Sequence, residues 1–234
     1  MNLMLLRSLA AAGATALLLT GCSDGGNPAN GNETGTEDPA FAEMTSWDAC
    51  EVLDGLQPIA DEVGIVGWGS ATAEGGEPGT REYGNTWDPD AVGCGNLVNL
   101  GENEGLGASG ELGVGIIPAE SEDQAASLYQ ERSESSSAAG ADGEQFAETA
   151  VSGPWDEGVL YFWGGVEDSP TTHLIARDGQ WLFFFELEHT LDFGLRNGGE
   201  PSLAFTEEGL HQWLVDTYLP EVNQTVNDKL AEVQ

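Results

Sequence analysis

The chain has 234 residues and a formal net charge of −35, because 41 acidic residues stand against only six lysines and arginines. Binding to a nucleic-acid backbone depends on clustered Lys and Arg, so this composition excludes a nucleic-acid-binding protein and also disfavours direct contact with anionic lipid surfaces. An acidic surface of this kind keeps a protein soluble, and it suits either a saline habitat or a cationic partner.

Residues 1–21 have the order of a bacterial signal peptide. A single positive charge, Arg7, precedes an apolar core from Leu9 to Leu19, which is too short to span roughly 30 Å of hydrocarbon comfortably. The four residues that end at Cys22 resemble the lipobox of bacterial lipoproteins. This resemblance implies that Cys22 carries long acyl chains such as palmitate, which would hold the protein on the outer face of the cytoplasmic membrane. An ordinary secreted protein with a chance cysteine is the alternative.

The next segment, residues 22–45, has the composition of a tether. It is rich in Gly, Asn, Pro, Thr and Glu and has almost no apolar side chain before Phe41. Such a segment cannot bury enough apolar surface to become ordered, so we expect a flexible leash with a root-mean-square span of about 25–30 Å. Residues 46–234 are then sufficient for one extracytoplasmic domain.

The three cysteines divide into one predicted lipid attachment site and one pair. With Cys22 assigned to lipid, Cys50 and Cys94 form an even pair in a compartment where disulfides persist, so we expect them to be bridged. Closing this loop would stabilise the fold by about 4 kcal/mol in the chain-entropy model. Two free thiols or a metal pair are the alternatives, although zinc would need more ligands close by.

The first part of the domain is predicted to form a helical region followed by three strands. Between Asp48 and Val63 apolar residues recur on one helical face, and Asp48 and Glu51 are spaced as a capping box. Proline is tolerated at the start of a helix but not in its interior, so Pro58 indicates two short helical pieces. The predicted strands cover residues 65–73, 94–100 and 110–117.

A second helix and a loop are predicted after the third strand. Ser121 and Gln124 resemble another capping box, and they open a helix that continues to about Ser133. Residues 135–143 are almost entirely Ser, Ala and Gly. This composition is typical of a mobile loop.

Three further strands and a final helix complete the predicted domain. The dipeptide Asp178-Gly179 indicates a hairpin between two of these strands. Thr206 is expected to begin the last helix, which Pro220 should kink or split. The strands cover residues 158–165, 171–177 and 181–188. Together the elements predict an α+β fold, in which helices pack on an antiparallel sheet within a single disulfide-stapled domain.

Several of these features together resemble an uncharacterised group of actinobacterial cell-envelope lipoproteins. They are the lipobox at Cys22, the polar tether, an early helix that contains Cys50-Glu-Val-Leu, a second cysteine, Cys94, on a strand, and an Ala-rich helix between Pro118 and Tyr129. The resemblance covers most of the chain. It implies a place in the cell envelope, but the group has no agreed activity and supplies no functional residues.

The sequence carries no complete catalytic motif of the common classes. It lacks a Gly-x-Ser-x-Gly elbow, a phosphate-binding Walker sequence and a calcium loop, and we predict neither a cofactor nor a metal site. The best titratable cluster is Glu186, Glu188 and His189 at the end of an aromatic strand, where both carboxylates should share one side with the imidazole adjacent. The alternative is a solvated strand end whose charges prevent edge pairing.

Two classes of function therefore remain. The favoured hypothesis is a non-catalytic module of the cell envelope, anchored by lipid, that binds an envelope protein, a wall polymer or a cationic ligand. The alternative is an envelope hydrolase or metal-dependent enzyme that uses Glu186, Glu188 and His189. The remaining histidines, His173 and His211, have no obvious partner in the sequence and are expected at the surface or satisfied in the core.

Overall fold

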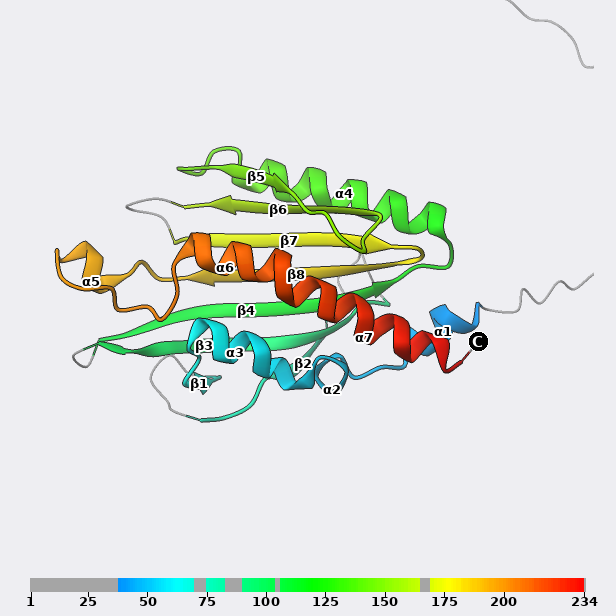
Figure 1. The fold of residues 1–234 in the computed structure, drawn as a ribbon, viewed down its shortest axis with the longest axis horizontal. Helices are drawn as coiled ribbons and strands as arrows, with labels where there is room; N and C mark the ends of the chain where they lie inside the picture. Colours follow the sequence, from blue (N-terminus) through cyan, green and yellow to red (C-terminus); the bar gives the residue numbers. More distant parts are fainter. Residues whose placement is uncertain (1–37, 70–74, 83–89, 104–105, 165–168, 234) are drawn as a thin grey trace, which may run out of the picture. The chain divides into compact units, whose positions relative to one another are not determined.

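The computed structural model describes residues 38–69, 75–82, 90–103, 106–164 and 169–233. Eight strands form one antiparallel sheet in the order β1-β3-β4-β8-β7-β6-β5, and β2 also pairs with β3 (Figure 1). The predicted α+β class is confirmed. The strands are β1 (Gly67–Trp68), β2 (Gly79–Glu82), β3 (Val92–Asn103), β4 (Leu106–Pro118), β5 (Ala147–Ala150), β6 (Glu157–Trp163), β7 (Thr171–Asp178) and β8 (Trp181–His189).

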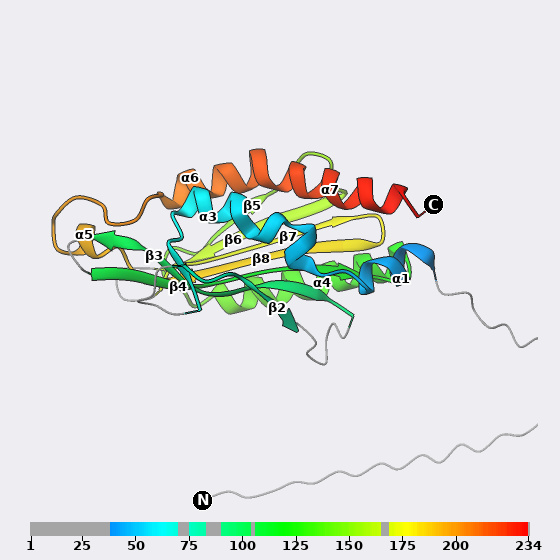
Figure 2. The same ribbon diagram turned by 90° about the horizontal axis from the view of Figure 1, so that it is seen from below.

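Helices lie on both faces of the sheet. Figure 2 shows α6 and α7 on the same side as α2 and α3, whereas α4 lies on the opposite side. The helical segments are α1 (Pro39–Thr45), α2 (Ala49–Val52), η1 (Asp54–Leu56), α3 (Gln57–Val63), α4 (Glu122–Gly140), α5 (Phe193–Arg196), α6 (Glu207–Trp213), η2 (Leu214–Tyr218) and α7 (Leu219–Ala231).

The central strand β8 contributes to a hydrophobic core on each face. Trp181, Phe183 and Phe185 enter the larger core, which also contains residues of α6, η2 and α7. Leu182 and Phe184 enter the smaller core, under α4. Successive side chains of a strand point to opposite faces, so one aromatic strand is enough to anchor both layers.

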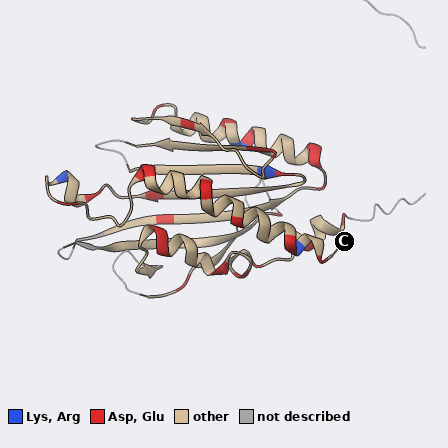
Figure 3. Ribbon diagram, viewed as in Figure 1, with Lys and Arg blue, Asp and Glu red and all other residues tan. Residues whose placement is uncertain are grey.

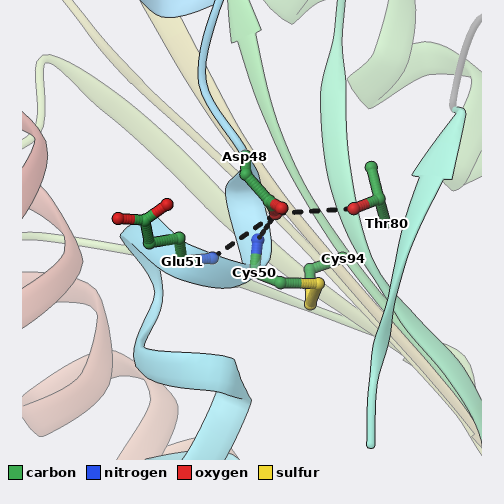
Figure 4. Close-up of a disulfide and its surroundings, with 5 residues drawn as sticks. All are labelled: Asp48, Cys50, Glu51, Thr80 and Cys94. Carbon is green, nitrogen blue, oxygen red and sulfur yellow. Dashed lines mark hydrogen bonds between the residues drawn. A yellow bond between two sulfur atoms is a disulfide. The ribbon is translucent and has the colours of Figure 1, made fainter.

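The disulfide between Cys50 and Cys94 joins α2 to β3 and confirms the predicted pairing. The two Cα atoms lie 4.9 Å apart, and the residues are separated by 44 positions in the sequence. Figure 4 shows Asp48 beside this bond, where its carboxylate accepts hydrogen bonds from the backbone of Cys50 at 2.9 Å and from the Thr80 hydroxyl at 3.4 Å. One acidic side chain therefore caps α2 and contacts β2 next to the covalent link.

The helical region before the sheet is divided as predicted, but into three pieces, α2, η1 and α3, and not two. Gly55 and Leu56 adopt left-handed backbone conformations with φ of +59° and +58°, which separate the pieces. Pro58 lies in the first turn of α3, where the missing N–H removes no helical hydrogen bond. The hairpin between β7 and β8 is also confirmed, since Asp178 pairs with Trp181 across two residues.

In the region predicted as a loop, residues 135–143, the chain instead continues as the last third of α4 as far as Gly140. Small residues are required here because the helix lies close to its neighbours. A Cβ atom on Gly140 would come within 2.7 Å of the Phe146 ring and 2.8 Å of the Trp163 ring, so the composition reflects close packing.

Other boundaries also differ from the prediction. The first helix, Pro39–Thr45, lies within the expected tether, because Asp38 caps it and it buries Phe41 and Met44. The strand expected over residues 65–73 is formed over Gly67–Trp68, and residues 70–73 lie outside the described part. By contrast, the helical region after Thr206 is split near Pro220 as predicted, because the π-helical turn η2 follows α6 and Pro220 lies in the first turn of α7.

Candidate functional site

The candidate cluster of Glu186, Glu188 and His189 does not converge in the structure. His189 is buried, with 4% of its surface exposed, and its ring meets the Phe205 ring edge-on at 5.3 Å, on the face that carries α6. Glu186 lies on the opposite face, toward α4, and Glu188 is exposed on the same side as Glu186. Consecutive strand residues point to opposite faces, so the imidazole is separated from both carboxylates by the sheet.

Glu186 is instead next to His173, which lies opposite it in the pairing of β7 with β8. The Nε2 atom of His173 lies 3.4 Å from the Glu186 carboxylate, and its Nδ1 atom shares a hydrogen bond of 3.1 Å with the hydroxyl of Ser136 on α4. Trp163 and Phe184 contact the His173 ring edge-on. We call these three polar residues, Ser136, His173 and Glu186, the α4 network.

The α4 network has the residue types of a hydrolase triad, but a substrate could not reach its serine. Ser136 is 5% exposed and lies between α4 and the sheet. The surface depression nearby is lined by other residues of α4, among them Tyr129 and Ser133, and by Tyr161 of β6. A nucleophile needs space for a substrate carbonyl beside it, so this network holds α4 on the sheet.

A cleft of about 700 Å³ lies beyond the end of β8, on the face that carries α6. One wall is the segment from Leu191 to Glu208, which includes α5 and the first turn of α6, and the other includes Phe162 of β6 and Pro170 before β7. His189 forms part of the lining. Many of the lining residues are apolar: Phe162, Pro170, Leu191, Leu195, Leu203 and Phe205.

Asp192 shapes the wall of this cleft. Its carboxylate accepts hydrogen bonds from the backbone N–H groups of Leu195 at 3.0 Å, Ser202 at 2.9 Å and Leu203 at 2.9 Å, and from the Ser202 hydroxyl at 2.8 Å. Desolvation acts to raise the Asp192 pKa, but these hydrogen bonds together outweigh it and lower the pKa to about 2. The carboxylate is therefore fully occupied in closing the loop around α5.

His189 presents a hydrogen-bond acceptor to the cleft. Its Nδ1 atom lies 3.0 Å from the Thr190 carbonyl oxygen, and since a carbonyl only accepts, Nδ1 carries the proton. Burial lowers the pKa of His189, which keeps the ring neutral at pH 7. The other nitrogen, Nε2, then has an unshared electron pair and no hydrogen-bond partner among the described residues.

A second, half-buried imidazole, that of His211 on α6, lies against the cleft wall at Phe162. The Nε2 atom of His211 and the hydroxyl of Thr172 share a hydrogen bond of 3.0 Å, and the His211 ring meets Phe162 edge-on at 5.2 Å. Burial and, to a smaller extent, the nearby His189 lower the pKa of His211 to about 4. Both imidazoles are therefore uncharged at neutral pH, and no charge of theirs opposes a cation in the cleft.

Charge around the cleft is predominantly negative. Asp192, Glu207 and Glu208 line it together with one basic residue, Arg196, at the end of α5. Burial raises the pKa of Glu207. Figure 3 shows acidic residues spread over the whole described fold and very few basic ones, so the surrounding field adds to the negative potential of the cleft.

The remaining predicted site residue, Cys22, lies outside the described residues. No group of three or more His, Cys, Asp or Glu side chains in the described ranges is arranged to hold a metal ion. None of the helices in that part of the chain combines the length and hydrophobicity that crossing a bilayer requires. No family model, curated protein or solved structure gives a significant match to this chain.

Sequence patterns did not identify this cleft, because its residues come from separate elements. His189 ends β8, His211 belongs to α6, and Phe162 belongs to β6. The local signal that was available is Thr206, the predicted start of the last helix, which caps α6 by accepting a hydrogen bond from Gly209 at 3.1 Å. That signal predicts where α6 begins, but it does not predict which residues form the opposite wall of the cleft.

Proposed function

We propose that this chain is a lipid-anchored lipoprotein on the outer face of the cytoplasmic membrane, and that its domain is a non-catalytic module that binds a small ligand in the cleft beside β8. The observation that carries the binding role is the cleft itself, in which mainly apolar walls surround an imidazole acceptor, Nε2 of His189. Small-molecule sites commonly combine apolar walls with few polar groups that set orientation.

A membrane-anchored position outside the cytoplasm is supported by the lipobox pattern at Cys22 and by the bridge between Cys50 and Cys94. Disulfides persist mainly in oxidising compartments. The enzyme hypothesis has less support, because the sheet separates His189 from Glu186 and Glu188 and because Ser136 of the α4 network is buried.

Ligand binding is tested with N-phenyl-1-naphthylamine, a neutral apolar probe that fluoresces when it leaves water. The full chain carries Cys22→Ala for this measurement, so that no acyl chain competes for the probe. Leu195 lines the cleft and is 59% exposed, and Leu195→Ser should weaken binding about fivefold by removing apolar contact area.

Val66→Ser is the matched control, because Val66 is also an exposed hydrophobic residue, at 43%, but does not line the cleft. It should leave the affinity for the probe unchanged. Absence of saturable binding to the unmodified cleft, or equal weakening by the two serine substitutions, would contradict the binding role.

Anchoring is tested separately by cell fractionation. Replacement of the lipid-bearing residue, Cys22→Ala, should release the domain into the medium, still folded because the Cys50–Cys94 bridge is untouched. Retention of the variant in the membrane fraction would refute the lipid anchor and leave the binding result standing.

A further inference from the structure

His189 gives the lining of the cleft one acceptor, Nε2, that has no partner among the described residues. His189 is 4% exposed, and its Nδ1–H is already committed to the Thr190 carbonyl at 3.0 Å. Nε2 is not among the buried side-chain atoms that lack a partner in the described residues, so water reaches it, and a ligand donor would take the place of that water. A ligand with an N–H or O–H donor next to Nε2 can make this hydrogen bond, whereas a carboxylate would meet another acceptor.

The charges around the cleft favour a cation among the possible donors. The lining contains three acidic residues, Asp192, Glu207 and Glu208, and one arginine, Arg196, so negative charges outnumber positive ones. Asp192 is saturated by backbone donors, but burial raises the pKa of Glu207, and no ion pair of Glu207 is formed by the described residues. A positive charge in the cleft would stabilise the ionised form of this carboxylate.

The overall charge acts in the same direction. A net charge of −35 attracts cations to the surface and repels anionic ligands, and this effect is strongest in a concave site with low-dielectric walls. The neutral state of His189 and His211 removes two charges that would oppose a cation.

We propose that the ligand of the cleft is a small primary amine with an apolar body, whose ammonium donates to Nε2 of His189 and faces the Glu207 carboxylate, while its apolar part packs on Phe205 and the neighbouring walls. This inference rests on the proposed function, since it names the ligand class for the same cleft. Charge-assisted hydrogen bonds are stronger than neutral ones. The ammonium group should therefore determine which ligands are preferred, while apolar contacts with the walls contribute affinity for any apolar ligand.

Four probes with one common chain separate these contributions: decylamine, decanol, decanoate and decyltrimethylammonium. Binding to the full Cys22→Ala chain is measured by titration calorimetry at neutral pH, below the concentration at which any probe forms micelles. Decylamine should bind about tenfold more tightly than decanol. Decyltrimethylammonium should be weaker than decylamine because it has the charge but no N–H donor, and decanoate should be weakest.

Two variants assign the preference to residues. His189→Phe keeps an aromatic ring against Phe205 but removes the acceptor, and Glu207→Gln removes the facing charge. Each should reduce the preference for decylamine over decanol several-fold while decanol affinity stays the same. Glu221→Gln, on the exposed side of α7, removes one negative charge elsewhere and should not change the preference.

The outcomes distinguish this inference from the function on which it rests. If decanol binds but the affinities of the four probes do not follow the expected order, the amine assignment is wrong and ligand binding stands. If none of the four probes binds, the proposed function fails as well. Circular dichroism of each variant checks the fold, and should His189→Phe not fold, Glu207→Gln and the probe series still decide the assignment.

Discussion

The two faces of the sheet each hold a histidine among aromatic rings, and the two imidazoles differ in what their nitrogens contact. On the α4 face, His173 uses both nitrogens, one toward Ser136 and one toward Glu186. On the α6 face, His189 uses Nδ1 toward Thr190 and leaves Nε2 to the cleft. Both imidazole nitrogens therefore have a protein partner on the α4 face, whereas only one of them does on the α6 face.

This difference separates a stabilising polar network from a binding site. A polar group that is satisfied within the protein gains nothing from a ligand, whereas an unsatisfied one does. The Ser136, His173 and Glu186 series looks more like an enzyme site by residue type, but the cleft beside His189 offers the space and the unused acceptor. Solvent access and a free hydrogen-bonding atom therefore indicate a binding site more strongly than the types of residue present do.

Reduction of the disulfide should have the largest effect and should act unequally on the two faces. Loss of the Cys50–Cys94 bond is expected to lower the free energy of unfolding by about 4 kcal/mol. Urea unfolding of Cys50→Ser/Cys94→Ser measures the total. Hydrogen exchange should rise most in α2 and α3, which the bond holds to β3, and least in α4, which lies on the other face. A uniform rise in exchange would contradict this division.

The main strands and the hairpin could be predicted because their signals are local. Alternation in β8 and the glycine at Gly179 depend on neighbouring residues in the sequence. The disulfide followed from counting cysteines. The last third of α4, which holds Ser136 and Gly140, has the composition of a loop, because the small residues that allow close packing are also the residues typical of turns.

The sites could not be predicted because they depend on pairing register and on packing between distant elements. Glu186 meets His173 only because β7 and β8 pair with these residues opposite each other. A shift of one residue would send either side chain to the other face. The cleft likewise needs the position of α6 over the end of the sheet, which brings His211 to Thr172.

Acid should weaken the α6 face through its histidines. The pKa of His211 falls from 6.5 to about 4 on folding, so between these values the unfolded chain binds more protons than the folded one. Stability is therefore full above pH 6.5 and falls as the pH decreases toward 4. The loss attributable to His211 should be about 2 kcal/mol, after allowance for solvent screening of a partly buried ring.

Urea unfolding at several pH values tests this loss. Carboxylates also titrate in this range, so the quantity of interest is the difference between the unmodified chain and His211→Gln. The variant should lack the decrease between pH 6.5 and 4 but keep any change caused by the carboxylates. Parallel pH profiles for the two proteins would show that His211 does not carry the proton linkage.

His173→Phe should have the smallest effect on stability and is the most direct test of the comparison between the faces. The new ring keeps contact with Trp163 and Phe184 but leaves the Ser136 hydroxyl without its imidazole partner, so the free energy of unfolding should fall by about 1–2 kcal/mol. Glu188→Gln, on the exposed side of β8, should change it by much less. Neither variant should alter probe binding, because the sheet separates both positions from the cleft; weaker binding in His173→Phe would mean that the two faces are coupled.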